Sequence, residues 1–168
     1  MNTNQVLSTT NPEYQKLETL LKSGNWKEAD YETARLILKI ANREKEGVLK
    51  LANIQNFPIE QLHIIDKMWV KYSNSHFGFS IQKQIYQNLI TEKDPQKNYQ
   101  QNWSDFCEKI GWKQAKKWLN YKDSDCNLTA PTAHLPCRGW GCLVAWWWVV
   151  DWKEAILARI YLLSHPDL

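Results

Sequence analysis

Thiol and imidazole groups gather in and directly after residues 122–141, a long stretch without helical periodicity. His134, Cys137 and Cys142 follow one another at short intervals, with Cys126 upstream. These residue types bind Zn²⁺, but the intervals match no familiar zinc finger and the flanking residues are apolar. A thiolate here could also add to an activated vinyl group of a bound ligand. Free buried thiols are the default expectation, so we predict no metal site and leave covalent ligand capture open.

The chain also lacks the pattern of a catalytic site. Glu28, Asp30 and Glu32 form a close acidic group, but on a helix such residues more commonly serve capping and i,i+4 pairing than acid–base chemistry. The serines and histidine of residues 73–80 have no orienting carboxylate beyond Asp66, and neither a nucleophile elbow nor a phosphate-binding glycine loop occurs. We therefore expect no enzymatic activity.

Length and composition favour one domain. Among the 168 residues, we expect the polar residues 1–10 to be a disordered lead-in and residues 11–168 to form a single domain. The ten tryptophans supply an unusual amount of large apolar surface. A formal net charge of +3 is too mild for a nucleic-acid-binding surface. Four cysteines without a secretory leader indicate a reducing compartment, so we expect a cytoplasmic location.

Helical periodicity runs through most of the chain. Leu62, Ile65 and Trp69 lie on one face of a central helix, and residues 77–79, FGF, form a tight corner before a second helix that Ser80 could cap. We expect further helices over residues 12–24, 26–44, 103–110, 112–121 and 142–163, and irregular segments over 47–58 and 122–141. The predicted fold is all-α, a compact bundle of about six to eight helices.

A resemblance to a known family follows from collinear motifs. Residues 65–69 (IDKMW), 72–73 (YS) and 77–80 (FGFS) resemble the signature of the Genomes Uncoupled Four (GUN-four) domain. Further pieces agree in order, namely residues 26–30 (WKEAD), 32–33 (ET), 111–112 (GW), 118–119 (WL) with Tyr121, 130–131 (AP) and 134–136 (HLP). The chain departs from the family at His76, where arginine is usual, and in a tail after Pro136 that is rich in tryptophan and cysteine.

The resemblance implies a helical domain shaped like a cupped hand, whose apolar palm holds a tetrapyrrole. Members of the family are porphyrin-binding proteins that stimulate magnesium chelatase, the enzyme that inserts Mg²⁺ into protoporphyrin IX for chlorophyll synthesis. Non-covalent binding of protoporphyrin IX or Mg-protoporphyrin IX and contact with the large, porphyrin-binding chelatase subunit are thus implied. We expect a non-catalytic monomer of cyanobacterial source.

Two other functions stay open at this point. One is a bilin or haem sensor that signals through protein contact without acting on the chelatase. The other is an interaction domain whose palm is filled and holds no pigment. Peripheral contact with a thylakoid membrane is also open, because residues 143–150, LVAWWWVV, could be buried in the core or rest on a bilayer but are too few to span one.

The expected ligand chemistry selects particular residues. A protoporphyrin is a flat apolar macrocycle with propionates at one edge, so its site needs apolar walls and a cation at the rim. Arg138 is the only arginine of residues 122–141, and its planar fork can hold a carboxylate in two contacts. By resemblance, Trp118 and residues 135–140 border the ligand, whereas Trp69, Phe77 and Phe79 belong to the core. The expected tetrapyrrole-binding residues are Val48, Leu51, Phe57, Trp118, Leu135, Cys137, Arg138 and Trp140.

Overall fold

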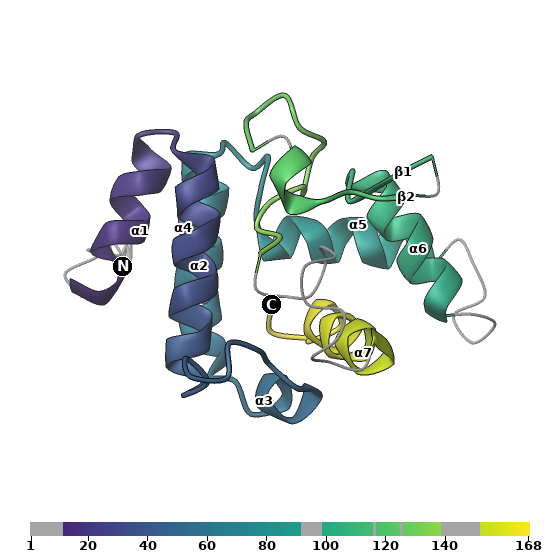
Figure 1. Cartoon of the computed structure of the whole chain (residues 1–168), viewed down its shortest axis with the longest axis horizontal. Helices are drawn as coiled ribbons and strands as arrows, with labels where there is room; N and C mark the ends of the chain where they lie inside the picture. The colour runs from purple at the N-terminus through teal and green to yellow at the C-terminus, as the bar shows by residue number, and fades with distance from the viewer. Residues whose placement is uncertain (1–11, 92–98, 116, 125, 139–151) are drawn as a thin grey trace, which may run out of the picture.

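The computed structural model describes residues 12–91, 99–115, 117–124, 126–138 and 152–168 (Figure 1). Within these ranges the protein is helical apart from one small hairpin, which confirms the predicted all-α class. The elements are α1 (Pro12–Lys22), α2 (Trp26–Ile40), α3 (Leu51–Gln55), α4 (Ile59–Tyr72), α5 (Phe79–Thr91), α6 (Tyr99–Lys109), β1 (Lys113–Gln114), β2 (Lys117–Trp118), the 3₁₀ turn η1 (Tyr121–Asp123) and α7 (Trp152–Leu163).

The first half of the molecule is a layer of three packed helices. In Figure 1, α1 lies beside α2 and α4 lies behind α2, and all three pairs of helices are in contact. Tyr14, Leu17 and Leu21 form the buried stripe of α1, as the periodicity predicts. Each buried leucine side chain contributes roughly 1.5–3 kcal/mol by leaving water. Gly24, with φ +70°, turns the chain into α2, which confirms the predicted helical hairpin.

The corner at residues 77–79 joins this layer to the second half. Gly78 has φ +140°, and a Cβ there would lie 2.8 Å from Asp66 Oδ1 and from Val70 Cγ2. Phe77 and Phe79 are fully buried on either side. The Ser80 backbone N–H donates to Asp66 Oδ1 at 3.0 Å, so a carboxylate of α4 caps the first turn of α5. The prediction that Ser80 itself caps this helix is therefore wrong.

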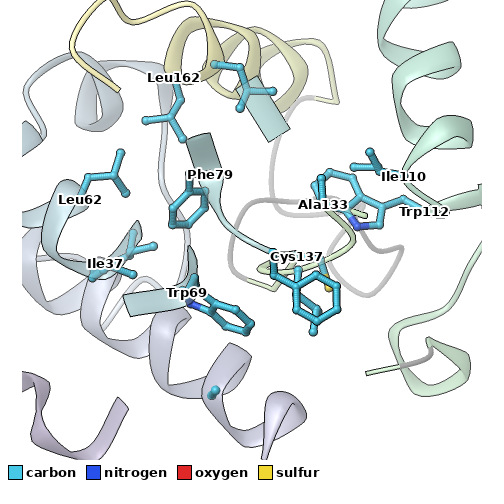
Figure 2. Packing of buried hydrophobic residues seen from close by; sticks show 14 of the residues in the cluster. Ile37, Leu62, Trp69, Phe79, Ile110, Trp112, Ala133, Cys137 and Leu162 are labelled. Carbon is cyan, nitrogen blue, oxygen red and sulfur yellow. The ribbon is translucent and has the colours of Figure 1, made fainter. Parts of the chain in front are cut away.

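A shared aromatic core connects the two halves (Figure 2). Trp69 is fully buried, and its Nε1 donates to Thr33 Oγ1 of α2 at 2.9 Å. Trp112, after α6, is also fully buried and donates from Nε1 to the His134 carbonyl at 2.7 Å. Both indoles thus bury their rings and still satisfy their N–H groups. The prediction that Trp69, Phe77 and Phe79 are core residues is confirmed.

Two segments differ from the sequence-based expectation. Residues 47–58, expected to be irregular, contain the short helix α3, which Asn53 caps by accepting from the Lys50 backbone N–H at 2.9 Å. Residues 112–121, expected to be a helix, form the β1–β2 hairpin and η1 instead. Gly111 redirects the chain into this segment with a φ of +78°, and a Cβ there would meet Pro131 at 2.7 Å.

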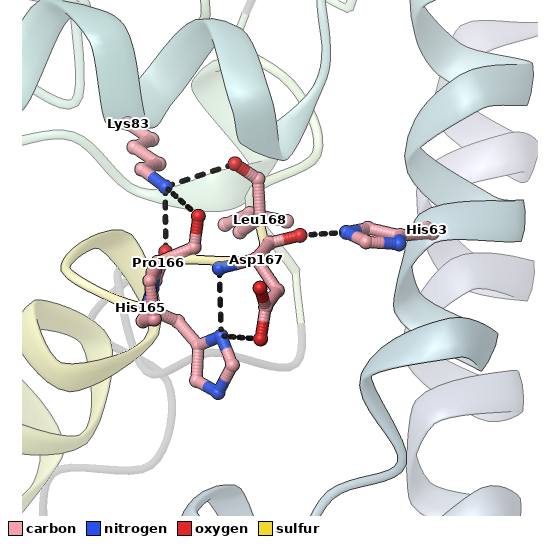
Figure 3. Close-up of polar contacts among 6 residues, drawn as sticks. All are labelled: His63, Lys83, His165, Pro166, Asp167 and Leu168. Carbon is pink, nitrogen blue, oxygen red and sulfur yellow. Dashed lines mark hydrogen bonds and ion pairs between the residues drawn. The ribbon is translucent and has the colours of Figure 1, made fainter.

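The C-terminal segment closes the structure. Helix α7 packs against α3 as well as α5 and α6. Beyond it, Lys83 Nζ of α5 donates to the carbonyls of His165 at 2.5 Å and Leu168 at 2.9 Å, while His63 of α4 contacts the Asp167 carbonyl (Figure 3). The predicted terminal helix is confirmed over Trp152–Leu163, and its expected beginning lies outside the described residues. No helix in the described part of the chain is long and apolar enough to cross a bilayer.

Candidate functional site

The candidate site is built on residues 126–138, a segment without regular secondary structure that is held from several sides. His134 is its deepest attachment. Its Nδ1 lies 2.8 Å from the Ile110 carbonyl and its Nε2 lies 2.6 Å from Ser124 Oγ. Because a carbonyl can only accept, Nδ1 carries a hydrogen, and Nε2 shares a hydrogen bond with the serine hydroxyl. His134 is therefore a structural residue whose two nitrogens are both used.

The corner and helix α5 hold the same segment from the other side. His76 Nε2 donates to the Ala130 carbonyl at 2.8 Å, and the Gly78 backbone N–H donates to the Leu135 carbonyl at 3.0 Å. Gln82, fully buried in α5, donates to the carbonyls of Ala133 at 3.0 Å and Pro136 at 2.9 Å. His76 thus fastens the loop to the corner.

The end of the segment rests on helix α2 through a buried carboxylate. Asp30 is fully buried, and its Oδ1 accepts from the backbone N–H groups of Cys137 at 2.9 Å and Arg138 at 3.1 Å. Its Oδ2 accepts from Arg138 N–H at 3.0 Å and from Cys137 Sγ at 3.2 Å. Burial raises the pKa of Asp30, and these hydrogen bonds offset only part of that rise. The backbone of residues 137–138 is therefore fixed against α2.

The same turn of α2 supplies a platform for the Arg138 side chain. The guanidinium carbon lies 3.7 Å from the centre of the Tyr31 ring and 4.9 Å from that of Tyr121. The two rings meet edge to face, 5.4 Å apart at 88°. No carboxylate whose side chain the structure describes forms an ion pair with Arg138. A half-buried cation is thus held in a fixed place, without an ion-pair partner among the described carboxylates.

The thiols of the segment are poorly suited to covalent chemistry. Cys137 is buried with its Sγ directed at the Asp30 carboxylate. Burial raises the pKa of the half-buried Cys126, and the Asp30 charge raises it further. Burial likewise raises the pKa of the Tyr121 phenol well above its ordinary value, so it stays protonated. Among the described residues, no group of three or more His, Cys, Asp or Glu side chains could hold a metal ion.

The structure brings together some of the expected binding residues and separates others. Cys137 and Arg138 lie together against α2, whereas the buried Leu135 is bound through its carbonyl to Gly78 at the corner. Trp118 is half-buried in β2, with Lys113 Nζ 5.7 Å from its ring centre. Trp140 lies outside the described residues.

Three further expected binding residues lie around α3. Val48, Leu51 and Phe57 are half-buried there, and the Leu51 backbone N–H donates to Glu154 Oε1 of α7 at 3.2 Å. Figure 1 shows α3 beyond the C-terminal end of α2, whereas Tyr31 is the sixth residue of that helix. The nine helical steps from Tyr31 to Ile40 correspond to about 14 Å along the axis. The residues around α3 therefore lie well away from Arg138 along α2.

Sequence reasoning missed the residues that hold Arg138, namely Asp30, Tyr31 and Tyr121. The spacing of Asp30 was one available signal. Asp30 lies four residues after Trp26 and three before Thr33, on the buried side of α2, where a carboxylate must find hydrogen-bond donors. Its donors lie more than a hundred residues later in the chain. No local pattern pointed to the two tyrosines.

Comparison with known proteins settles the family. The family model described as GUN4-like matches residues 7–155. The chain belongs to the GUN4-like family. The solved structure of ligand-free GUN4 from Arabidopsis thaliana superposes with a TM-score of 0.66 at 24% identity, covering 94% of this chain and 95% of that one. GUN4 from Chlamydomonas reinhardtii gives 0.66 at 25% identity, with coverages of 96% and 95%. The resemblance seen in the sequence and the helical GUN4 fold are confirmed.

Curated relatives of this GUN4-like chain come from red algae, a cyanobacterium and a plant. It is 34% identical over 127 residues to ycf53 of Porphyra purpurea, covering 74% of this chain and 49% of that one. It is 30% identical over 127 residues to a Ycf53-like protein of Synechocystis, with coverages of 74% and 50%. The chloroplastic tetrapyrrole-binding protein of Arabidopsis thaliana is 35% identical over 80 residues, 46% and 29% of the two chains. The chain spans about half the length of the first of these relatives.

Proposed function

We propose that this GUN4-like protein binds a tetrapyrrole non-covalently, as protoporphyrin IX or Mg-protoporphyrin IX, and has no catalytic activity of its own. The observation that carries the proposal is the Arg138 guanidinium, which rests on Tyr31 and Tyr121 without an ion-pair partner among the described side chains. A cation in such a setting favours an anionic ligand that also has a flat apolar body. The relative from Arabidopsis that is named a tetrapyrrole-binding protein supports the same ligand class.

In this proposal Arg138 pairs with a propionate. A guanidinium and a carboxylate form two parallel charge-assisted hydrogen bonds, which are stronger than neutral ones. Because the Arg138 backbone is already fixed by Asp30, little conformational freedom is lost on binding. Tyr31, which is 37% exposed, and the half-buried Trp118 offer aromatic faces for the macrocycle. Leu135 and Cys137 support the site from beneath, and Val48, Leu51, Phe57 and Trp140 complete the proposed contacts.

Pigment titration tests this proposal. Purified protein is titrated with deuteroporphyrin, Mg-deuteroporphyrin and a bilin while tryptophan quenching and the Soret band are followed. We expect porphyrin binding with a Kd near or below about 1 μM, and Arg138→Ala raises it by about 5–150-fold, the loss of one charge-assisted pair. Arg35→Ala is the control, because the Arg35 guanidinium is already paired with Glu32. No quenching by any porphyrin would refute the function, and preferential bilin binding would replace it with the sensor alternative.

We further propose that the bound pigment is passed to or from magnesium chelatase in chlorophyll synthesis, through contact with the large, porphyrin-binding subunit. Holding the pigment would also shield it from oxygen and light. The test is a chelatase assay reconstituted with and without the protein at limiting porphyrin. Stimulation by the wild type that Arg138→Ala lacks would support this role. Pigment binding without any effect on the chelatase would instead favour a paralogue that acts elsewhere.

A further inference from the structure

We propose that Asp30 is a positioning residue of the tetrapyrrole site, which holds Arg138 in place for the ligand without touching the ligand itself. This inference rests on the proposed function. Asp30 and Tyr31 are neighbours in α2, and both contact Arg138, Asp30 through the arginine backbone and Tyr31 through its guanidinium. A single turn of α2 therefore fixes both ends of the Arg138 side chain.

The contacts of Asp30 determine the course of the loop backbone. Two successive N–H groups, those of Cys137 and Arg138, converge on one carboxylate, which requires a specific local curvature of the chain. Two hydrogen bonds from successive residues to one buried side chain leave the backbone little freedom, so this curvature is well defined. Removing the carboxylate would leave two buried or half-buried N–H groups without an acceptor, and the segment would have to move to satisfy them.

Glu32 shows what a purely stabilising carboxylate looks like in the same helix. It is 2% exposed, lies two residues beyond Asp30, and pairs with Lys16 of α1 at 2.8 Å and Arg35 at 2.6 Å. By contrast, no described lysine or arginine side chain forms an ion pair with Asp30. A buried carboxylate without a cation is costly, and an apolar residue there would be less so. Asp30 instead fixes the backbone positions of residues 137 and 138.

The experiment is a double-mutant cycle on porphyrin affinity. Asp30→Asn keeps one acceptor oxygen and Asp30→Ala keeps none, so we expect the Kd for deuteroporphyrin to rise about threefold and about tenfold. Neither change raises the Kd by more than about twofold when Arg138 is already alanine, because the effect passes through Arg138. Glu32→Gln, the matched control, leaves the Kd unchanged. If Asp30 had a merely structural role, its substitution would weaken porphyrin binding by the same factor whether residue 138 is arginine or alanine.

A second measurement needs no pigment. Alkylation of Cys137, mapped by peptide mass spectrometry under native conditions, should be at least about tenfold faster in Asp30→Asn than in the wild type or Glu32→Gln, because the buried thiol loses its contact and its cover. Equal effects of Asp30→Ala with and without Arg138, or unchanged Cys137 protection, would overturn the positioning role. Normal porphyrin binding in both Asp30 variants would overturn it while leaving the proposed function intact. Failure of the wild type to bind porphyrin would refute both.

Discussion

The two faces of α2 handle charge in opposite ways. On the face toward α1, Glu32 is buried between Lys16 and Arg35, and Lys39 pairs with Glu13 at 2.9 Å. On the face toward the loop, the Asp30 carboxylate binds backbone N–H groups while the Arg138 guanidinium rests on aromatic rings. The first face neutralises its charges within the protein. The second face uses its carboxyl group to position the Arg138 backbone, and the Arg138 guanidinium forms no ion pair with a described carboxylate.

Reversing one charge on each face should break this comparison most strongly. Arg138→Glu places a carboxylate where the proposed propionate binds, so we expect porphyrin affinity to fall by at least about a hundredfold. Arg35→Glu, in the ion pair with Glu32, places two acids side by side, which should lower the free energy of unfolding by about 1 kcal/mol and leave porphyrin affinity unchanged. Titration and urea unfolding of both variants measure these effects. Equal losses of affinity would show that the two faces do not differ.

Stability against pH should separate the two buried acids. Burial raises the pKa of Asp30 above its ordinary value of 3.8, so the folded state holds its proton longer than the unfolded chain. As pH rises from about 4 through this raised pKa, the wild type should therefore lose stability relative to Asp30→Asn, and the loss then stays constant.

Glu32 should behave in the opposite sense. Burial alone would raise its pKa, but the hydrogen bonds and charges of Arg35 and Lys16 outweigh burial and lower the pKa below 4.5. Relative to Glu32→Gln, the stabilisation by Glu32 is thus present at pH values above its ordinary pKa. It disappears as pH falls through the lowered pKa. Urea midpoints between about pH 3 and 7 provide the measurement. If the stability difference between wild type and variant changed with pH in the same direction for Asp30 and for Glu32, the opposite pKa shifts assigned to these two residues would be contradicted.

Substitutions of Tyr31, whose ring packs against the Arg138 guanidinium, should have a smaller effect on porphyrin affinity. Tyr31→Leu removes the ring beneath Arg138 and should weaken porphyrin binding by about 0.5–2 kcal/mol, or about 2–30-fold. Tyr31→Phe keeps the ring and should retain nearly all of the affinity. Fluorescence titration of the pair distinguishes ring stacking from a role of the phenol. If Tyr31→Phe and Tyr31→Leu weaken porphyrin binding equally, the Tyr31 ring does not contribute through cation–π contact.

The smallest effect is expected on the face toward α1. Lys16 pairs with Glu32 but is 68% exposed, so Lys16→Ala should lower the free energy of unfolding by only about 0.5 kcal/mol, and added salt should reduce the difference. Porphyrin affinity should not change. Urea unfolding at low and high salt measures this effect. A loss above about 2 kcal/mol would mean that the α1 face depends on this pair far more than its exposure implies.

Periodicity and turn residues predict most of the fold because they act locally. The stripe of α1, the turn at Gly24 and the corner at Gly78 all follow from nearby residues. The β1–β2 hairpin could not be predicted, because residues 112–121 have enough apolar residues for a helix and the deciding φ values are those of Gly111 and Ala115. The cap of α5 by Asp66 is a tertiary contact between two helices.

The candidate site was predicted in part for the same reason. Arg138 stands out in the sequence as the single arginine of a long loop, and a loop is where a binding cation is expected. The residues that hold it lie elsewhere: Asp30 and Tyr31 in α2, and Tyr121 in η1. Likewise, the separation of α3 from Arg138 depends on the length and direction of α2, which no motif encodes.

The central claim is that Arg138 binds a pigment carboxylate, and removing that carboxylate tests it most directly. Affinities for deuteroporphyrin and for its dimethyl ester are measured with wild-type protein and with Arg138→Ala. We predict that the wild type prefers the free acid by about tenfold or more and that Arg138→Ala has lost this preference. A preference of the same size in both proteins would show that the propionates bind elsewhere and would contradict the account.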